Sequence, residues 1–91
     1  MTVEVRIPTM LRAQVGGAAT VAAEGATVGD VIDHVVQAHP GLAGQIVSDG
    51  TLHRFVNVYV NDDDIRYLDK LDTKVGDGDT VSILPAVAGG S

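Results

Sequence analysis

The chain contains no cysteine and no tryptophan, and its aromatic side chains are two tyrosines and one phenylalanine. The lack of cysteine excludes a disulfide framework, a thiolate metal site and a thiol nucleophile. Aromatic residues make up 3% of the 91 residues, whereas apolar residues as a group make up 45%. We therefore expect one domain, with a core built from Val, Ile, Leu and Ala.

Basic residues are also scarce, since six Lys and Arg stand against twelve Asp and Glu, for a net charge of −6. This charge argues against nucleic acid and against an anionic membrane surface as partners, and it favours protein partners with basic rims. The N-terminus lacks the basic and then apolar pattern of a secretory signal, and no apolar run is long enough to span a bilayer. The predicted location is the cytoplasm.

Polar and apolar residues alternate, as in half-buried strands, over residues 2–7, 55–61 and 80–84. A weaker strand is predicted over 18–22, joined to the first as a hairpin through Gly16–Gly17. A short returning strand is predicted over 65–67.

The spacing of apolar residues changes to three and four between Val28 and Val36, which predicts one amphipathic helix. Thr27 is its expected N-cap, and His39–Pro40 ends it because the residue before proline avoids helical dihedrals. A further helical turn is expected within 41–49. The polar segments 61–64 and 76–79 are predicted turns, and Leu68 and Leu71 are expected to cover one edge of the core.

This order of elements predicts an α+β domain of the β-grasp (ubiquitin-like) class, in which one helix covers a mixed sheet in ββαββ order. The first and last strands are expected to be neighbours in the middle of the sheet. We place the domain at residues 1–85 and a flexible C-terminal tail at residues 86–91.

No set of residues predicts catalysis within the chain. The acidic groups at Asp62–Asp64 and at Asp77 and Asp79 lack the spacing of a calcium loop, and polar turns explain them. The three histidines, at positions 34, 39 and 53, lack the spacing of zinc ligands. We expect no bound metal or cofactor and no enzymatic activity of the chain by itself.

The C-terminal tail is made of small residues with uncharged side chains, in the order Ala86, Val87, Ala88, Gly89, Gly90 and Ser91. Fully extended, residues 85–90 span roughly 20 Å. Glycine has no Cβ, so Gly89 and Gly90 suit a narrow channel in which the carboxylate approaches a nucleotide phosphate. The plainer alternative is a frayed end without function.

Three segments of the chain, 5–12, 52–61 and 76–90, together resemble the ubiquitin-like sulfur carrier proteins of the ThiS/MoaD family. The resemblance spans nearly the whole chain. It implies that an E1-like adenylyltransferase and sulfurtransferase uses ATP to adenylate the carboxylate of Gly90, which then becomes a thiocarboxylate. It also implies that a synthase for cysteine, a thiosugar or a related metabolite accepts the sulfur.

The same resemblance implies that partner enzymes dock on an apolar sheet face near the last strand and on the tail. Leu84 matches the apolar position before the family's proline, here Pro85, and Ala86, Val87 and Ala88 follow it. Alternation alone adds Phe55 and Tyr59 to this face, for which the alternative is incidental surface.

One residue departs from the family pattern, because Ser91 follows Gly90. Either a JAMM-type metalloprotease removes it, or it is an added or blocking residue. Two other functions remain open, which are the small subunit of molybdopterin synthase and a ubiquitin-like interaction module without sulfur chemistry.

Overall fold

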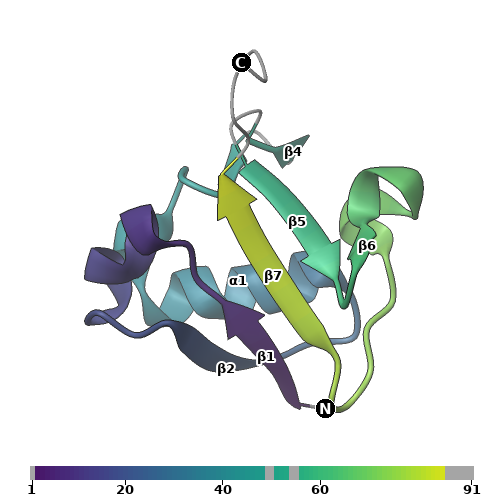
Figure 1. Cartoon of the computed structure of the whole chain (residues 1–91), viewed down its shortest axis with the longest axis horizontal. Coiled ribbons are helices and arrows are strands. Elements are labelled where there is room, and N and C mark those ends of the chain that lie inside the picture. The colour runs from purple at the N-terminus through teal and green to yellow at the C-terminus, as the bar shows by residue number, and fades with distance from the viewer. Residues whose placement is uncertain (1, 49–50, 54–55, 86–91) are drawn as a thin grey trace.

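The computed structural model describes residues 2–48, 51–53 and 56–85, and it contains one main sheet crossed on one face by the helix α1 (Figure 1). The sheet has five strands in the order β2-β1-β7-β5-β6. Their bounds are Thr2–Arg6 for β1, Thr20–Glu24 for β2, Val56–Val60 for β5, Asp63–Asp64 for β6 and Thr80–Pro85 for β7. A separate pair joins β3 (Val47–Ser48) to β4 (Thr51–Leu52).

The first and last strands lie side by side in the middle of the sheet, as predicted. β1 runs parallel to β7, with Glu4 opposite Thr80 and Arg6 opposite Ser82. Every other neighbouring pair in the main sheet is antiparallel. This mixed sheet with one covering helix confirms the predicted β-grasp arrangement.

The core lies between the sheet and α1 (Val28–Ala38) and is aliphatic, as the composition predicted. Alternate residues of the central strands face the helix, so Val5, Val58 and Val81 are fully buried. The helix begins where expected, because the Asp30 N–H donates to Thr27 Oγ1 at 3.2 Å and so caps its N-terminus. It ends at His39, whose N–H donates to the Val35 carbonyl.

Two predicted elements are wrong or displaced. The expected strand over 65–67 is a 3-10 helix, η3 (Ile65–Tyr67), and the short strand is β6 just before it. The cause is local, since the Arg66 N–H donates to Asp64 Oδ1 at 2.8 Å while the Ile65 side chain is buried. The second strand starts at Thr20 instead of Ala18.

The edge of the core near η3 also differs from the prediction. Leu71 is half-buried against the core, whereas Leu68 is exposed. Leu71 belongs to the 3-10 helix η4 (Lys70–Asp72). Leucine at 68 therefore does not cover the core.

The connections hold more structure than the sequence predicted. Between β1 and β2 lies the 3-10 helix η1 (Thr9–Val15), which buries Leu11 and Val15 and ends at Gly16 with φ 71°. The positive φ explains the glycine, because residues with a Cβ rarely adopt it. After α1, the expected further turn is the 3-10 helix η2 (Pro40–Leu42).

Candidate functional site

The last described strand, β7, lies in the middle of the sheet and ends at Pro85. The pairs between β7 and β1 end with Ser82 opposite Arg6, whereas the pairs with β5 continue to Leu84 opposite Asn57 and Pro85 opposite Val56. Pro85 is the last described residue, and it lies at the end of a strand with neighbours on both sides (Figure 1). The described chain therefore ends on a central strand of the sheet.

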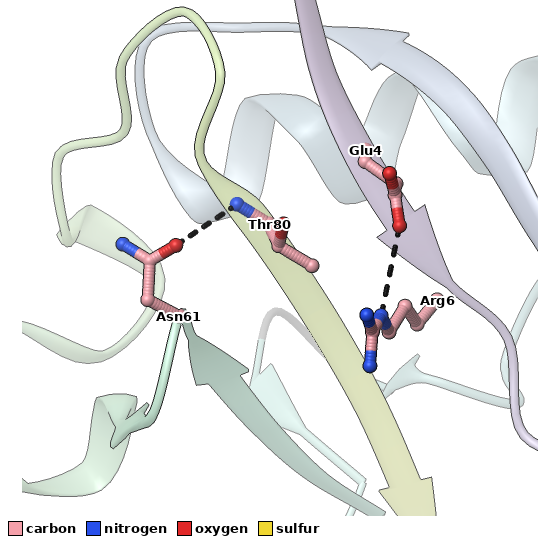
Figure 2. Close-up of polar contacts among 4 residues, drawn as sticks. All are labelled: Glu4, Arg6, Asn61 and Thr80. Atoms are coloured by element: carbon pink, nitrogen blue, oxygen red, sulfur yellow. Dashed lines mark hydrogen bonds and ion pairs between the residues drawn. The ribbon is translucent and has the colours of Figure 1, made fainter.

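The face of the sheet opposite α1 carries an open groove that runs along β7, with a volume of about 740 Å³. We call it the outer-face groove. Figure 2 shows part of this face, with the side chains of Glu4 and Arg6 in front of the sheet and the helix behind it. The groove is lined by Arg6, Met10 and Arg12 on the side of β1 and η1, by Tyr59 and Asn61 on the side of β5, and by Ser82, Leu84 and Pro85 of β7.

Two apolar side chains are exposed in this groove. Leu84 is 45% exposed and Met10 is 62% exposed, whereas Ile83, next to Leu84, is 1% exposed and belongs to the core. The difference follows from the pleat of β7, which directs successive side chains to opposite faces. Exposed apolar side chains beside the start of the tail are typical of a docking surface.

Three arginine side chains lie on or near β1 and β5, the two strands that pair with β7. Arg6 of β1 forms an ion pair with Glu4 at 3.6 Å between Nε and Oε2, and both side chains are more than half exposed. Arg12 Nε donates to the Ile7 carbonyl at 3.1 Å, just past the end of β1. Arg66 Nη2 donates to the Val56 carbonyl at 3.2 Å, which is at the start of β5.

Asn57 has a buried side-chain oxygen. Among the residues that the structure describes, its Oδ1 has no hydrogen-bond partner, although Asn57 lies opposite Leu84 on the outer side of β5. An unpaired buried oxygen costs roughly 1–3 kcal/mol.

Asp79 closes the predicted turn at 76–79, and Asp77 connects this turn to the start of β1. Asp79 Oδ2 accepts the Gly76 N–H at 2.8 Å, and Asp77 Oδ1 accepts the Thr2 N–H at 3.2 Å. On the other side of the sheet, His34 Nδ1 lies 2.7 Å from the Glu24 nitrogen and so links α1 to β2. Within the described ranges, no three His, Cys, Asp or Glu side chains gather closely enough to hold a metal ion.

The structure describes only part of the predicted site. Leu84 and Pro85 are exposed, and Tyr59 is half-buried and lines the same groove as Leu84. Phe55 and the tail residues Ala86, Val87, Ala88, Gly89, Gly90 and Ser91 lie outside the described residues. Among residues 2–48, 51–53 and 56–85, no helix is long and apolar enough to cross a membrane.

Sequence reasoning missed several residues of the groove, among them Arg6, Met10 and Arg12. Arg6 could have been found, because alternation places it on the same outward face as Glu4. Met10 and Arg12 had no such signal, since only the position of η1 brings them beside β7.

Comparison with known proteins identifies the family of the chain. The model of the ThiS family matches residues 5–90. The sulfur carrier protein CysO of Mycobacterium tuberculosis H37Rv is 50% identical over 93 residues, which cover 99% of this chain and 100% of that protein. Small archaeal modifier protein 3 of Haloferax volcanii is 45% identical over 65 residues, or 71% of each chain.

A solved structure shares the fold. In the crystal structure of the Amycolatopsis orientalis BexX/CysO complex, the matching chain has a TM-score of 0.90 and 53% identity, and the match covers 96% of this chain and 98% of that one. The predicted resemblance is therefore confirmed, including the prediction of a sulfur carrier that is not itself an enzyme. Because this match spans residues 5–90, the chain belongs to the ThiS family.

Proposed function

We propose that this carrier holds sulfur as a thiocarboxylate on its own Gly90 and donates it to a synthase that makes cysteine, a thiosugar or a related metabolite. The observation that carries the proposal is the position of β7. This central strand ends at Pro85, beside a groove with exposed Leu84 and Met10. The match to the ThiS family, moreover, continues to residue 90.

The chemistry requires activation of a carboxylate. In the active site of an E1-like enzyme, a carboxylate oxygen of Gly90 attacks the α-phosphorus of ATP, and pyrophosphate leaves. A sulfur nucleophile at the oxidation level of sulfide then attacks the acyl carbon, so that a C–S bond forms and the C–O bond to AMP breaks. AMP departs with the bonding electron pair, whereas a free carboxylate has no comparable leaving group. The nucleophile of the later transfer is thus installed on the chain, which itself has no cysteine.

Docking and chemistry take place at different positions along the chain. The groove holds the folded domain against the partner, and residues 85–90 reach roughly 20 Å from it when extended. Because Gly89 and Gly90 have no Cβ, they suit a narrow passage toward the nucleotide. The partner binds the domain at residues 1–85, and it carries out its chemistry on residues 86–91.

The partners are proteins. They are the E1-like adenylyltransferase and sulfurtransferase, which uses ATP, and the synthase that accepts the sulfur. The BexX/CysO complex supports a carrier of this kind that associates with a protein partner. A JAMM-type metalloprotease would remove Ser91. We place the carrier in the cytoplasm, and its net charge of −6 disfavours nucleic acid and anionic membrane surfaces as partners.

The test is the intact mass of the chain after incubation with the E1-like enzyme, ATP and sulfide. A chain that ends at Gly90 should gain the mass difference between sulfur and oxygen, and only when ATP is present. The chain that ends at Ser91 and the Gly90→Val variant are the matched controls, and neither should gain this mass. If the chain ending at Gly90 gives no ATP-dependent product, the proposal is refuted.

The similarity to small archaeal modifier protein 3 supports a second candidate, which is attachment to other proteins. The activation step is the same, but the amine of a lysine attacks the acyl-adenylate and forms an isopeptide bond. Mass spectrometry separates the two candidates. Lysine adducts of the Gly90 end on other chains, without any thiocarboxylate, would favour the modifier.

A further inference from the structure

Basic charge is concentrated at the end of the sheet where β7 ends. Of the six basic residues, Arg6 lies opposite Ser82, and Arg12 contacts the Ile7 carbonyl beyond the end of β1. Arg66 contacts the carbonyl of Val56, which is the strand partner of Pro85. Arg6 and Arg12 therefore line the groove, whereas Arg66 contacts the start of β5 and is not among the groove residues.

Acidic charge is concentrated at the other end of β7. Asp77 and Asp79 precede this strand, and Asp62 and Asp63 follow β5, where Asp62 also lines the groove at the end opposite Pro85. Asn61 connects the two groups, because its Nδ2 donates to Asp79 Oδ1 at 3.4 Å and its Oδ1 accepts the Thr80 N–H (Figure 2). Over the roughly 20 Å of a six-residue strand, the charge thus changes from negative to positive.

The arginines are available to a partner. Arg6 is paired with Glu4, but both side chains are exposed, at 66% and 51%, so that water and salt weaken the pair. In the described part of the chain, no carboxylate lies within ion-pair distance of Arg12 or Arg66. A guanidinium group offers paired donors that match the two oxygens of a carboxylate.

We propose that the outer-face groove docks a surface of the activating enzyme that is apolar at its centre and carries Asp or Glu carboxylates at its rim. The carboxylates pair with Arg6 and Arg12, and the apolar centre covers Met10 and Leu84. This inference rests on the proposed function, since its partner is the enzyme that activates Gly90. The net charge of −6 predicts a partner surface with basic groups around most of the contact. At the groove, in contrast, we expect acidic groups on the partner.

The charge distribution also orients the carrier during encounter. Carboxylates on the partner attract the end with the arginines and repel the end with Asp77 and Asp79. The carrier therefore approaches with the end of β7 first, which is the orientation that delivers the tail. Contact with the partner then buries the apolar side chains of the groove, and the arginine–carboxylate pairs fix the orientation of the carrier on the enzyme.

The test compares Arg6→Glu with Lys74→Glu in the chain that ends at Gly90. Both variants change the net charge equally, but Lys74 is exposed and lies outside the groove. We expect Arg6→Glu to raise the KM of the activating enzyme for the carrier about tenfold at low ionic strength and less at high ionic strength. Lys74→Glu should change KM less than about twofold. The value of kcat should stay unchanged, because Gly90 is intact.

Glu4→Gln is the complementary variant. It removes the internal partner of Arg6, so it should lower KM, by about two- to threefold. The dissociation constant is also measured without ATP, which tests docking whether or not a thiocarboxylate forms. Circular dichroism checks that each variant is folded.

Two outcomes would overturn this inference. Equal changes for Arg6→Glu and Lys74→Glu, including no change in either, would show that the groove has no special role. If the wild-type chain self-associates, and Arg6→Glu abolishes that association without changing the affinity for the enzyme, the occupant is a second copy. Normal docking without any thiocarboxylate would instead refute the proposed function alone.

Discussion

Truncation of two adjacent side chains of β7 should affect two different properties, the stability of the domain and its docking to the activating enzyme. Ile83 is 1% exposed and packs in the core, whereas Leu84 is 45% exposed in the outer-face groove. Ile83→Ala should lower the free energy of unfolding by about 2–5 kcal/mol, because it removes buried methyl groups and leaves a cavity. A domain of this size has roughly 5–15 kcal/mol in total, so this loss is a large fraction.

Leu84→Ala should cost about 1 kcal/mol, because full burial of a leucine is worth roughly 1.5–3 kcal/mol and about half of this side chain remains in water. Its effect should appear in docking. We expect a higher KM of the activating enzyme for Leu84→Ala, and a KM near that of the wild type for Ile83→Ala under conditions in which it is folded.

The assay for stability is urea unfolding followed by far-ultraviolet circular dichroism, since the chain has no tryptophan to report by fluorescence. The ratio of the two losses tests the assignment of faces. A loss for Leu84→Ala as large as that for Ile83→Ala would refute it. An unchanged KM for Leu84→Ala would remove Leu84 from the docking surface.

Three further variants test local features by the same urea assay. Thr27→Ala removes the acceptor for the Asp30 N–H and should cost about 1 kcal/mol, and no loss would mean that the cap is replaced by water. Asn57→Val removes an unpaired buried oxygen from a strand and should raise the free energy of unfolding by about 1 kcal/mol, and a decrease would show that the oxygen has a partner in solution. Gly78→Ala should cost about 1 kcal/mol through its φ of 87° alone, because the space around it is open, and a neutral result would show that the turn relaxes.

Long periodic segments could be predicted from the sequence, and short ones could not. Alternation placed Val56, Val58 and Val60 on the buried side of β5, and the three- and four-residue spacing placed α1 with its cap at Thr27. A strand of two residues, such as β6, has no period to detect. Its place in the sheet depends on the backbone hydrogen bonds that a neighbouring strand offers.

The candidate site likewise has residues that the sequence could predict and residues that it could not. The exposure of Leu84 could be predicted, because successive residues of a strand face opposite sides of the sheet and the neighbouring Ile83 is buried. The contributions of Met10 and Arg12 could not be predicted, because η1 is held beside β7 by burial of Leu11 and Val15 and not by its own sequence pattern. The tail residues lie outside the described residues, so their roles stay predictions.

The parallel pairing of β1 with β7 has a consequence for synthesis of the protein. Glu4 pairs with Thr80, which is synthesised much later. The centre of the sheet therefore cannot form until nearly the whole described domain has left the ribosome. Until then Val3 and Val5 lack the packing that β7 provides, and an incomplete chain is a substrate for proteases and chaperones. Completion of the last strand also completes the outer-face groove, which is the docking surface that we propose for the activating enzyme.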